Sequence, residues 1–321
     1  MRVRVESEVF TGPVDVAEVF RLFDLFLRGN HVWEAEMTQA AEVGVFFGKH
    51  MPPLSQTLTS LAMKTGAASA WRPTEPPQVT VTATTLTDDL HDLTGPAILM
   101  VENNASDKAF LKAVAMVLDG DDLLTAIDQG LLDIRHGGGK HDAVRQANDH
   151  AERFRRTPRV ALLLDSDRLY PGQETVCHRL AARARQAGVA VHVLEFRETE
   201  NYVPNRVLAP NGRRRDSSEA SRRLSALKEL NDRQRAHFDM KNGFKSSSDG
   251  GVVVDTVQRD LYADVPRRTL VKLGTGFGSD LTGRMEESAS QGRIKEVDLS
   301  SLGEGVVEEL RRVLRMLRTI V

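Results

Sequence analysis

From about residue 96, short apolar runs alternate with longer segments in which apolar residues recur at helical spacing. Four runs predict strands at 97–102, 131–135, 160–165 and 189–195, and segments such as 175–186 predict helices between them. Strands that alternate with helices favour a parallel sheet with right-handed crossovers. The pattern therefore predicts an α/β fold, in which helices flank a parallel sheet.

The chain before this region has a different pattern. Valines alternate with charged residues over the first five positions and predict a strand, and apolar residues at 16–23 predict a helix. The proline-rich segment 71–77 breaks any helix and marks a boundary, and the threonine-rich segment after it is prone to form a strand. We expect residues 1–94 to form a smaller α+β region.

The chain after residue 205 is predicted to be mainly helical. A basic, helical insertion is expected at roughly 215–236, and residues 306–320 predict a last helix with leucines and valines on one face. The short apolar stretch at 268–273 predicts one more strand.

Composition restricts the class of protein. The chain has 321 residues, 40% of them hydrophobic and 27% charged, with a net charge of −2, which excludes a disordered chain or a coiled coil. The single cysteine, Cys177, is predicted in the middle of a helix and has no partner for an internal disulfide, which favours a reducing compartment. No segment approaches the roughly 20 apolar residues of a membrane span. We expect a cytoplasmic protein that does not enter a membrane.

Acidic residues follow three of the predicted strands. Glu102 follows the first, Asp165 and Asp167 follow the third, and Glu200 comes shortly after the fourth. Neighbouring strands lie about 4.8 Å apart, so acids at their carboxyl ends lie close together. Carboxylates this close repel one another unless a cation lies between them, and Mg²⁺ prefers such oxygen ligands. The sequence therefore predicts a site for Mg²⁺ or Mn²⁺.

These residues carry a family resemblance. The order strand, Glu102, Ser106-Asp107, helix, then a glycine turn at 137–139 and a strand with Asp165-x-Asp167 resembles the Toprim domain. This domain is shared by topoisomerases, bacterial primases and the nuclease half of OLD-family proteins. Residues 197–202, Arg-Glu-Thr-Glu-Asn-Tyr, resemble an element of OLD-type and bacterial defence Toprim nucleases. Asn103 departs from the pattern, because a glycine commonly follows the glutamate.

The resemblance implies an enzyme that cuts DNA or RNA phosphodiester bonds with two metal ions. It divides the chain into the region 1–94, a Toprim core at 95–205, and a part at 206–321 that holds the insertion and completes the nuclease domain. The implied metal ligands are Glu102, Asp107, Asp165, Asp167 and Glu200.

The resemblance also implies further roles and partners. Glu102 would serve as general acid or base, and a lysine would lie near the scissile phosphate, for which Lys241 is favoured over Lys272. Because no nucleotide-hydrolysis motif is present, any control by ATP would come from a separate ABC-type ATPase, as in two-component anti-phage defence systems. A homo-oligomer is also expected.

The segment 206–245 carries a local excess of positive charge, with eleven Arg and Lys against five acids. A phosphate-rich partner, DNA or tRNA, would explain this excess, and a solvated helical face is the alternative. The candidate nucleic-acid-binding residues are Arg213, Arg214, Arg215, Arg222 and Arg223.

Alternatives stay open for the motif and for single residues. Asp-x-Asp also binds nucleotide-sugar diphosphates in metal-dependent glycosyltransferases, although that interpretation gives Glu102 no role. A non-catalytic Toprim-like subunit that binds a partner or nucleic acid is a third interpretation. Asp107 has the alternative role of a helix cap, and Glu198 that of a partner of Arg197 or a solvent-facing acid. The sequence 136–141, His-Gly-Gly-Gly-Lys-His, lacks the P-loop spacing and is interpreted as the glycine turn of the sheet.

Overall fold

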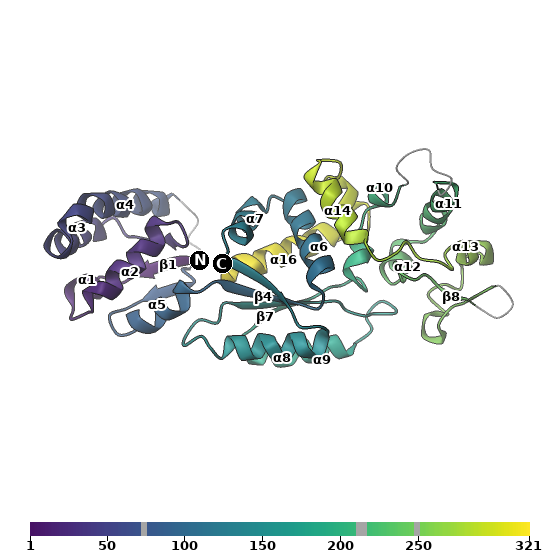
Figure 1. The fold of residues 1–321 in the computed structure, drawn as a ribbon, viewed down its shortest axis with the longest axis horizontal. Coiled ribbons are helices and arrows are strands. Elements are labelled where there is room, and N and C mark those ends of the chain that lie inside the picture. Colours follow the sequence, from purple (N-terminus) through teal and green to yellow (C-terminus); the bar gives the residue numbers. More distant parts are fainter. Residues whose placement is uncertain (72–75, 210–216, 247–250) are drawn as a thin grey trace.

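The computed structural model describes residues 1–71, 76–209, 217–246 and 251–321. The molecule is elongated, with the N-terminal region at one end, a four-stranded sheet in the middle and a helical part at the other end (Figure 1).

The N-terminal region is built on a parallel sheet of three strands in the order β2-β1-β3. Its elements are β1 (Arg2–Val5), α1 (Glu8–Thr11), α2 (Val16–Leu27), β2 (Val32–Trp33), α3 (Gln39–His50), α4 (Pro52–Ala70), β3 (Val79–Val81) and α5 (Leu86–Thr94). The strand at the start of the chain and the helix over 16–23 are thus confirmed. Because helices alternate with parallel strands, the region is α/β and not the expected α+β.

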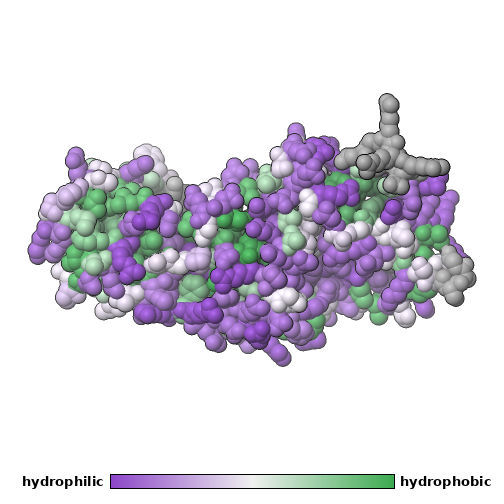
Figure 2. Space-filling model, viewed as in Figure 1, coloured by the Kyte–Doolittle hydropathy of each residue, from purple (hydrophilic) through white to green (hydrophobic). Residues whose placement is uncertain are grey.

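This region has a hydrophobic core of its own. The ring of Phe23 lies at its centre, with ring centroids 4.8 Å from Trp33 and 5.0 Å from Phe47. Several large apolar side chains stay exposed on its helices, among them Val45 and Met63. Figure 2 shows hydrophobic residues among hydrophilic ones at this end of the molecule.

The central region confirms the predicted parallel sheet flanked by helices. Its elements are β4 (Ala97–Val101), α6 (Asn104–Val117), α7 (Asp121–Asp128), β5 (Leu132–His136), α8 (Lys140–Ala151), β6 (Val160–Leu164), α9 (Val176–Gln186) and β7 (Ala190–Val193). The strand order is β5-β4-β6-β7, and every pair is parallel. Cys177 is the second residue of α9 and not a mid-helix residue, because the helix begins only at Val176.

Alternate residues of the two central strands face opposite layers. Leu99 and Leu163 pack into the core formed with α6, α7 and α16, whereas Met100 and Leu162 pack against α8 and α9. Figure 1 shows these helices on the two sides of the sheet. Burial on both faces explains why β4 and β6 are apolar at every position.

The chain after β7 continues the core that lies on one face of the sheet. Its elements are η1 (Thr199–Tyr202), α10 (Asn205–Leu208), α11 (Ser217–Leu227), α12 (Asp232–Ala236), β8 (Lys245–Ser246), β9 (Val252–Val253), η2 (Thr256–Gln258), α13 (Arg267–Lys272), α14 (Leu281–Ser290), α15 (Glu296–Ser300) and α16 (Val306–Ile320), where η1 and η2 are 3₁₀ helices. The last helix is confirmed at both ends. Within 217–246 and 251–321, and in the other described ranges, no helix is long and apolar enough to cross a membrane.

The strand predicted at 268–273 is wrong, because these residues form helix α13 and the turn after it. Pro266 fixes the backbone before the first turn, and the buried residues Thr269 and Leu273 are spaced by four, as on one face of a helix. The core above the sheet is thus contacted by a helical face and not by an additional strand.

Candidate functional site at the carboxyl edge of the sheet

The carboxyl ends of β4 and β6 lie side by side in the middle of the sheet. From β4 the chain crosses to β5 on one side, and from β6 it crosses to β7 on the other. This is a topological switch point, where open α/β sheets bind their ligands. Glu102 follows β4 and Asp165 follows β6, and Glu102 Oε1 accepts a hydrogen bond of 3.2 Å from the backbone N–H of Asp165. The structure thus brings these two predicted site residues together.

Asp107 lies in the first turn of α6, beside Glu102. Its Oδ2 accepts from the Asn103 N–H at 2.8 Å, and its Oδ1 accepts from the Ser106 hydroxyl at 3.1 Å. These bonds satisfy the start of the helix, which is the capping role that the sequence left open. Burial raises the pKa of Asp107 above its ordinary value, although both hydrogen bonds act in the opposite direction.

Two buried residues, Asn201 and Tyr202, hold the segment that follows β7 in place. The Asn201 amide donates to the carbonyls of Arg235 and Phe238, each at 2.9 Å. The Tyr202 hydroxyl donates to Glu309 Oε2 at 2.7 Å. The conformation of Glu198 and Glu200 is therefore set by contacts with two later parts of the chain.

Glu309 is a buried residue of α16 that the sequence analysis did not identify. Besides the Tyr202 hydroxyl, it accepts from the Glu195 N–H at 2.7 Å, and His192 Nε2 lies 3.1 Å away. A buried glutamate on the apolar face of an amphipathic helix is the only sequence signal for this role, and it does not name the partners.

Lys241 joins the two glutamates of this segment. Its Nζ lies 3.2 Å from Glu198 Oε2 and 3.0 Å from Glu200 Oε1, and Glu198 also pairs with Arg197 at 3.1 Å. Burial acts to lower the pKa of Lys241, but the two carboxylates outweigh burial and raise it above its ordinary value. Lys272, the other candidate lysine, lies exposed on α13, away from these contacts.

A glycine-rich segment holds the loop that carries Lys241. The Phe277 N–H donates to the Met240 carbonyl at 2.8 Å, and the Gly278 N–H donates to the Lys241 carbonyl at 3.3 Å. A Cβ atom at Gly276 would collide with the Lys241 carbonyl, so only glycine permits this approach. Residues 274–278 therefore position Lys241.

Carboxyl groups crowd around Asp165. Burial raises the pKa of Asp165 well above its ordinary value, and the neighbouring acids raise it further. In decreasing order of effect, these neighbours are Asp107, Glu102, Glu200 and Glu198. Burial also raises the pKa of Glu102 and of Glu200. Lys241 and Arg197 together do not balance five acids, so this part of the site favours the binding of a further cation.

Asp167 contacts other partners than Asp165 does. Its backbone adopts φ 53°, an uncommon conformation for a residue other than glycine, and its N–H donates to the Arg197 carbonyl at 3.0 Å. Its Oδ2 accepts from Lys140 Nζ, and the Cys177 thiol donates to the same oxygen at 3.4 Å. Lys140 was passed over in the sequence as part of a glycine turn, although a lysine at a helix start beyond a strand end is a recognisable signal for anion binding.

The donor set fits a hard divalent cation in its chemistry. Glu102, Asp165 and Glu200 offer carboxylate oxygens, and their raised pKa values reflect a crowding that a bound Mg²⁺ or Mn²⁺ would relieve. Among the residues that the structure describes, no three Asp, Glu, His or Cys side chains already stand as a set of metal ligands. A bound ion would therefore draw these side chains closer together.

The predicted nucleic-acid-binding arginines have different positions. Arg213, Arg214 and Arg215 lie outside the described residues. Arg222 is exposed on α11. Arg223 instead donates to the Gly276 carbonyl at 2.6 Å and pairs with Glu219 at 3.6 Å, so it supports the segment that positions Lys241.

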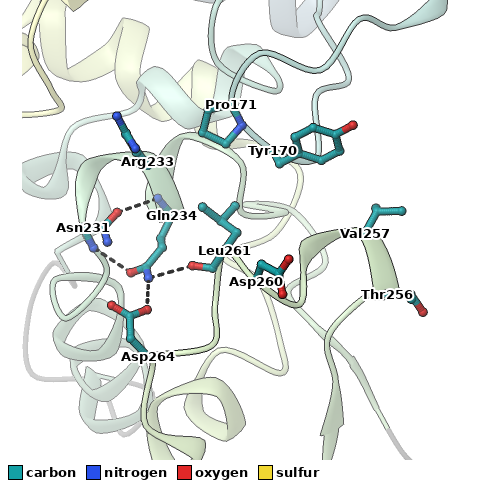
Figure 3. A pocket seen from close by; sticks show the side chains of 10 residues that line it. All are labelled: Tyr170, Pro171, Asn231, Arg233, Gln234, Thr256, Val257, Asp260, Leu261 and Asp264. Atoms are coloured by element: carbon teal, nitrogen blue, oxygen red, sulfur yellow. Dashed lines mark hydrogen bonds between the residues drawn. The ribbon is translucent and has the colours of Figure 1, made fainter.

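A cavity of about 720 Å³ lies away from the acidic group, between α12 and the segment around η2 (Figure 3). Gln234 crosses its wall, donating to Asp264 Oδ1 at 2.6 Å and to the Leu261 carbonyl at 2.9 Å. A smaller cavity of about 300 Å³ lies beside the Lys241 loop and reaches Arg197 and Asp239. Neither cavity is lined by the acids that follow β4 and β6.

Comparisons with protein-family models, with curated proteins and with solved structures gave no match for this chain. The acidic site is therefore interpreted from its own geometry.

Proposed function

We propose that this protein is a metal-dependent nuclease that cuts phosphodiester bonds with Mg²⁺ or Mn²⁺. One observation carries the proposal: at the switch point of a parallel sheet, Glu102 accepts a hydrogen bond from the Asp165 N–H within a group of five acids that outnumber the cations paired with them, Lys241 and Arg197. The strand arrangement is compatible with a Toprim-like sheet, which supports the resemblance seen in the sequence.

In this proposal, different residues of the site have different roles. Glu102, Asp165 and Glu200 would hold the ions, which when bound activate water and neutralise charge at phosphorus. Asp107 would add a ligand, although its oxygens already cap α6. Lys241 would contribute an ammonium group beside the scissile phosphate, which carries negative charge.

Nucleic acid is the proposed substrate because it combines phosphodiester bonds with a chain of negative charge. The basic segment at 206–245 includes Lys241 and has an excess of positive charge. Metal-dependent transfer of a sugar has less support, because it gives the contact between Glu102 and Asp165 no purpose.

The test is cleavage of labelled single-stranded DNA, duplex DNA and RNA by the full chain with Mg²⁺ or Mn²⁺. Asp165→Asn should reduce the rate on the order of 10³-fold, the scale for removing a group that stabilises a transition state. Asp142→Asn is the matched control, because Asp142 is an exposed acid of α8 that pairs with Arg145. Cleavage that persists in chelator, or equal activity of the two variants, would contradict the proposal.

A further inference from the structure

A glycine turn determines the position of Lys140, the lysine that contacts Asp167. Lys140 is the first residue of α8 and follows Gly137, Gly138 and Gly139. A Cβ atom at Gly137 would collide with the backbone of Ala143, and Gly138 and Gly139 have φ values of 76° and 134°. Only glycines allow this turn. The turn brings the start of α8 close to the carboxyl edge of the sheet.

The carboxylate of Asp167 contacts this lysine. The left-handed backbone at Asp167 is held by its bond to the Arg197 carbonyl, and its carboxylate contacts Lys140 Nζ. The unfavourable backbone conformation persists because the surroundings determine it. Two acids that are one residue apart in the sequence thus serve different partners.

The ammonium group of Lys140 reaches the acidic group while staying open to solvent. Its side chain is 28% exposed, and that of Asp167 is 39% exposed. Burial raises the pKa of Glu102, and Lys140 is the charge that opposes this most strongly, ahead of Lys241. The acidic group therefore lies between two lysines, one from α8 and one from the loop after α12.

We propose that Lys140 binds a phosphate of the nucleic-acid substrate, and that Asp167 is its positioning residue and not a metal ligand. An ammonium group on a flexible stem binds phosphate as a point charge, and a carboxylate beside it restricts its orientation. The inference rests on the proposed nuclease function, because it names the substrate group that this side of the site receives.

The first experiment measures binding of a short labelled single-stranded oligonucleotide over a salt series in an Asp165→Asn background. Adding Lys140→Met should flatten the log–log salt slope by about 0.7, the contribution of one neutralised phosphate on a single strand. Lys140→Arg should retain the slope. Lys49→Met is the matched control, because Lys49 is exposed on α3 at the opposite end of the molecule.

The second experiment separates the two roles of the Asp-x-Asp pair. Mn²⁺ binding without substrate should weaken tenfold or more in Asp165→Asn and stay at the wild-type value in Asp167→Asn. In cleavage assays, Asp167→Asn and Lys140→Met should be non-additive, because both changes disable one phosphate contact.

The outcomes distinguish this inference from the proposed function. If the protein cuts nucleic acid but Lys140→Met has the slope of Lys49→Met, Lys140 has no phosphate contact and the nuclease function stands. If binding depends on Lys140 but no metal produces cleavage, the contact stands and the nuclease function is wrong. If the protein neither binds nor cuts, both are wrong. Equal loss of Mn²⁺ binding in the Asp165 and Asp167 variants would make Asp167 a metal ligand.

Discussion

The two halves of the acidic site balance their charge in different ways. The Asp165 half consists of five acids and two cations: Glu102, Asp107, Asp165, Glu198, Glu200, Lys241 and Arg197. The Asp167 half consists of one acid, one lysine and a thiol: Asp167, Lys140 and Cys177. The first half has an excess of negative charge and the second is neutral. The two aspartates of one motif therefore have different partners, and only Asp167 has a left-handed backbone.

The difference in burial strengthens this contrast. Glu200 is fully buried, whereas the Asp167 side chain is 39% exposed. Crowded, buried carboxylates gain from a divalent cation, but an exposed ion pair contributes little to stability and leaves its lysine available to a ligand. We therefore assign metal binding to the Asp165 half and phosphate binding to the Asp167 half.

The largest expected effect compares the two aspartates directly. Cleavage should fall on the order of 10³-fold in Asp165→Asn, because a ligand of the reacting centre is lost. It should fall only about 10-fold to 100-fold in Asp167→Asn, the scale for a residue that orients another. Initial rates at saturating metal measure both. If the two variants lose the same activity, the site is not divided as proposed.

The elements that meet at this site could be predicted because their patterns are strong. β4 and β6 are apolar at every position, and α16 has a continuous apolar stripe, so period and length identify all three. α13 was mistaken for a strand because a short apolar run does not distinguish the two. The position of the acids at one edge of the sheet could be predicted from the parallel arrangement of the strands alone.

The pairing of these residues could not be predicted. Tyr202 and Glu309 are 107 positions apart, and nothing local to either residue specifies the bond between them. The left-handed backbone at Asp167 is likewise not encoded in the Asp-x-Asp pattern. Lys140 and Asp167 are 27 positions apart, and nothing local to either residue specifies their contact.

The second prediction compares the two lysines by stability. Lys241→Met removes the cation that pairs with Glu200, which is fully buried, while Glu198 keeps its pair with Arg197. Loss of a fully buried partner costs about 3–5 kcal/mol, and we expect about 2 kcal/mol here because Lys241 is 34% exposed. Lys140→Met should cost less than about 1 kcal/mol, since its pair is exposed.

Urea unfolding in chelator measures this difference at neutral pH. If Lys140→Met is more destabilising than Lys241→Met, the prediction is wrong. The pair of Lys140 and Asp167 would then contribute more to stability than the pairs of Lys241. The free energy of unfolding should fall with urea concentration at the same slope in both variants. Equal slopes show that neither change alters the unfolded state.

The third prediction concerns pH in the absence of metal. The raised pKa of Asp165 means that the folded protein holds its proton more tightly than the unfolded chain. Its contribution to stability is therefore fully present below the unfolded value of 3.8 and is lost as pH rises through the raised folded pKa. At neutral pH in chelator, Asp165→Asn should be more stable than wild type by about 1 kcal/mol or more, since one pKa unit corresponds to about 1.4 kcal/mol.

The advantage of Asp165→Asn should shrink as the pH falls, because wild type then takes up the proton that the variant does not need. Mg²⁺ or Mn²⁺ should reverse the order at neutral pH by stabilising wild type alone. Asp167→Asn should show neither effect, since its carboxylate is already neutralised by Lys140. A destabilised Asp165→Asn in chelator would instead assign Asp165 a structural role.

The smallest expected effect separates two adjacent arginines that the sequence treated alike. Arg222 is exposed on α11 and free to meet a phosphate, whereas Arg223 is bound to the Gly276 carbonyl behind Lys241. In an Asp165→Asn background, Arg222→Ala should flatten the salt slope of single-strand binding by about 0.7. Arg223→Ala should leave the slope near its starting value but lower the melting temperature, because the buried segment that positions Lys241 loses a hydrogen bond. If Arg223→Ala flattens the slope and Arg222→Ala does not, the bound arginine is released to reach substrate, and the Asp165 half is then more mobile than its contacts indicate.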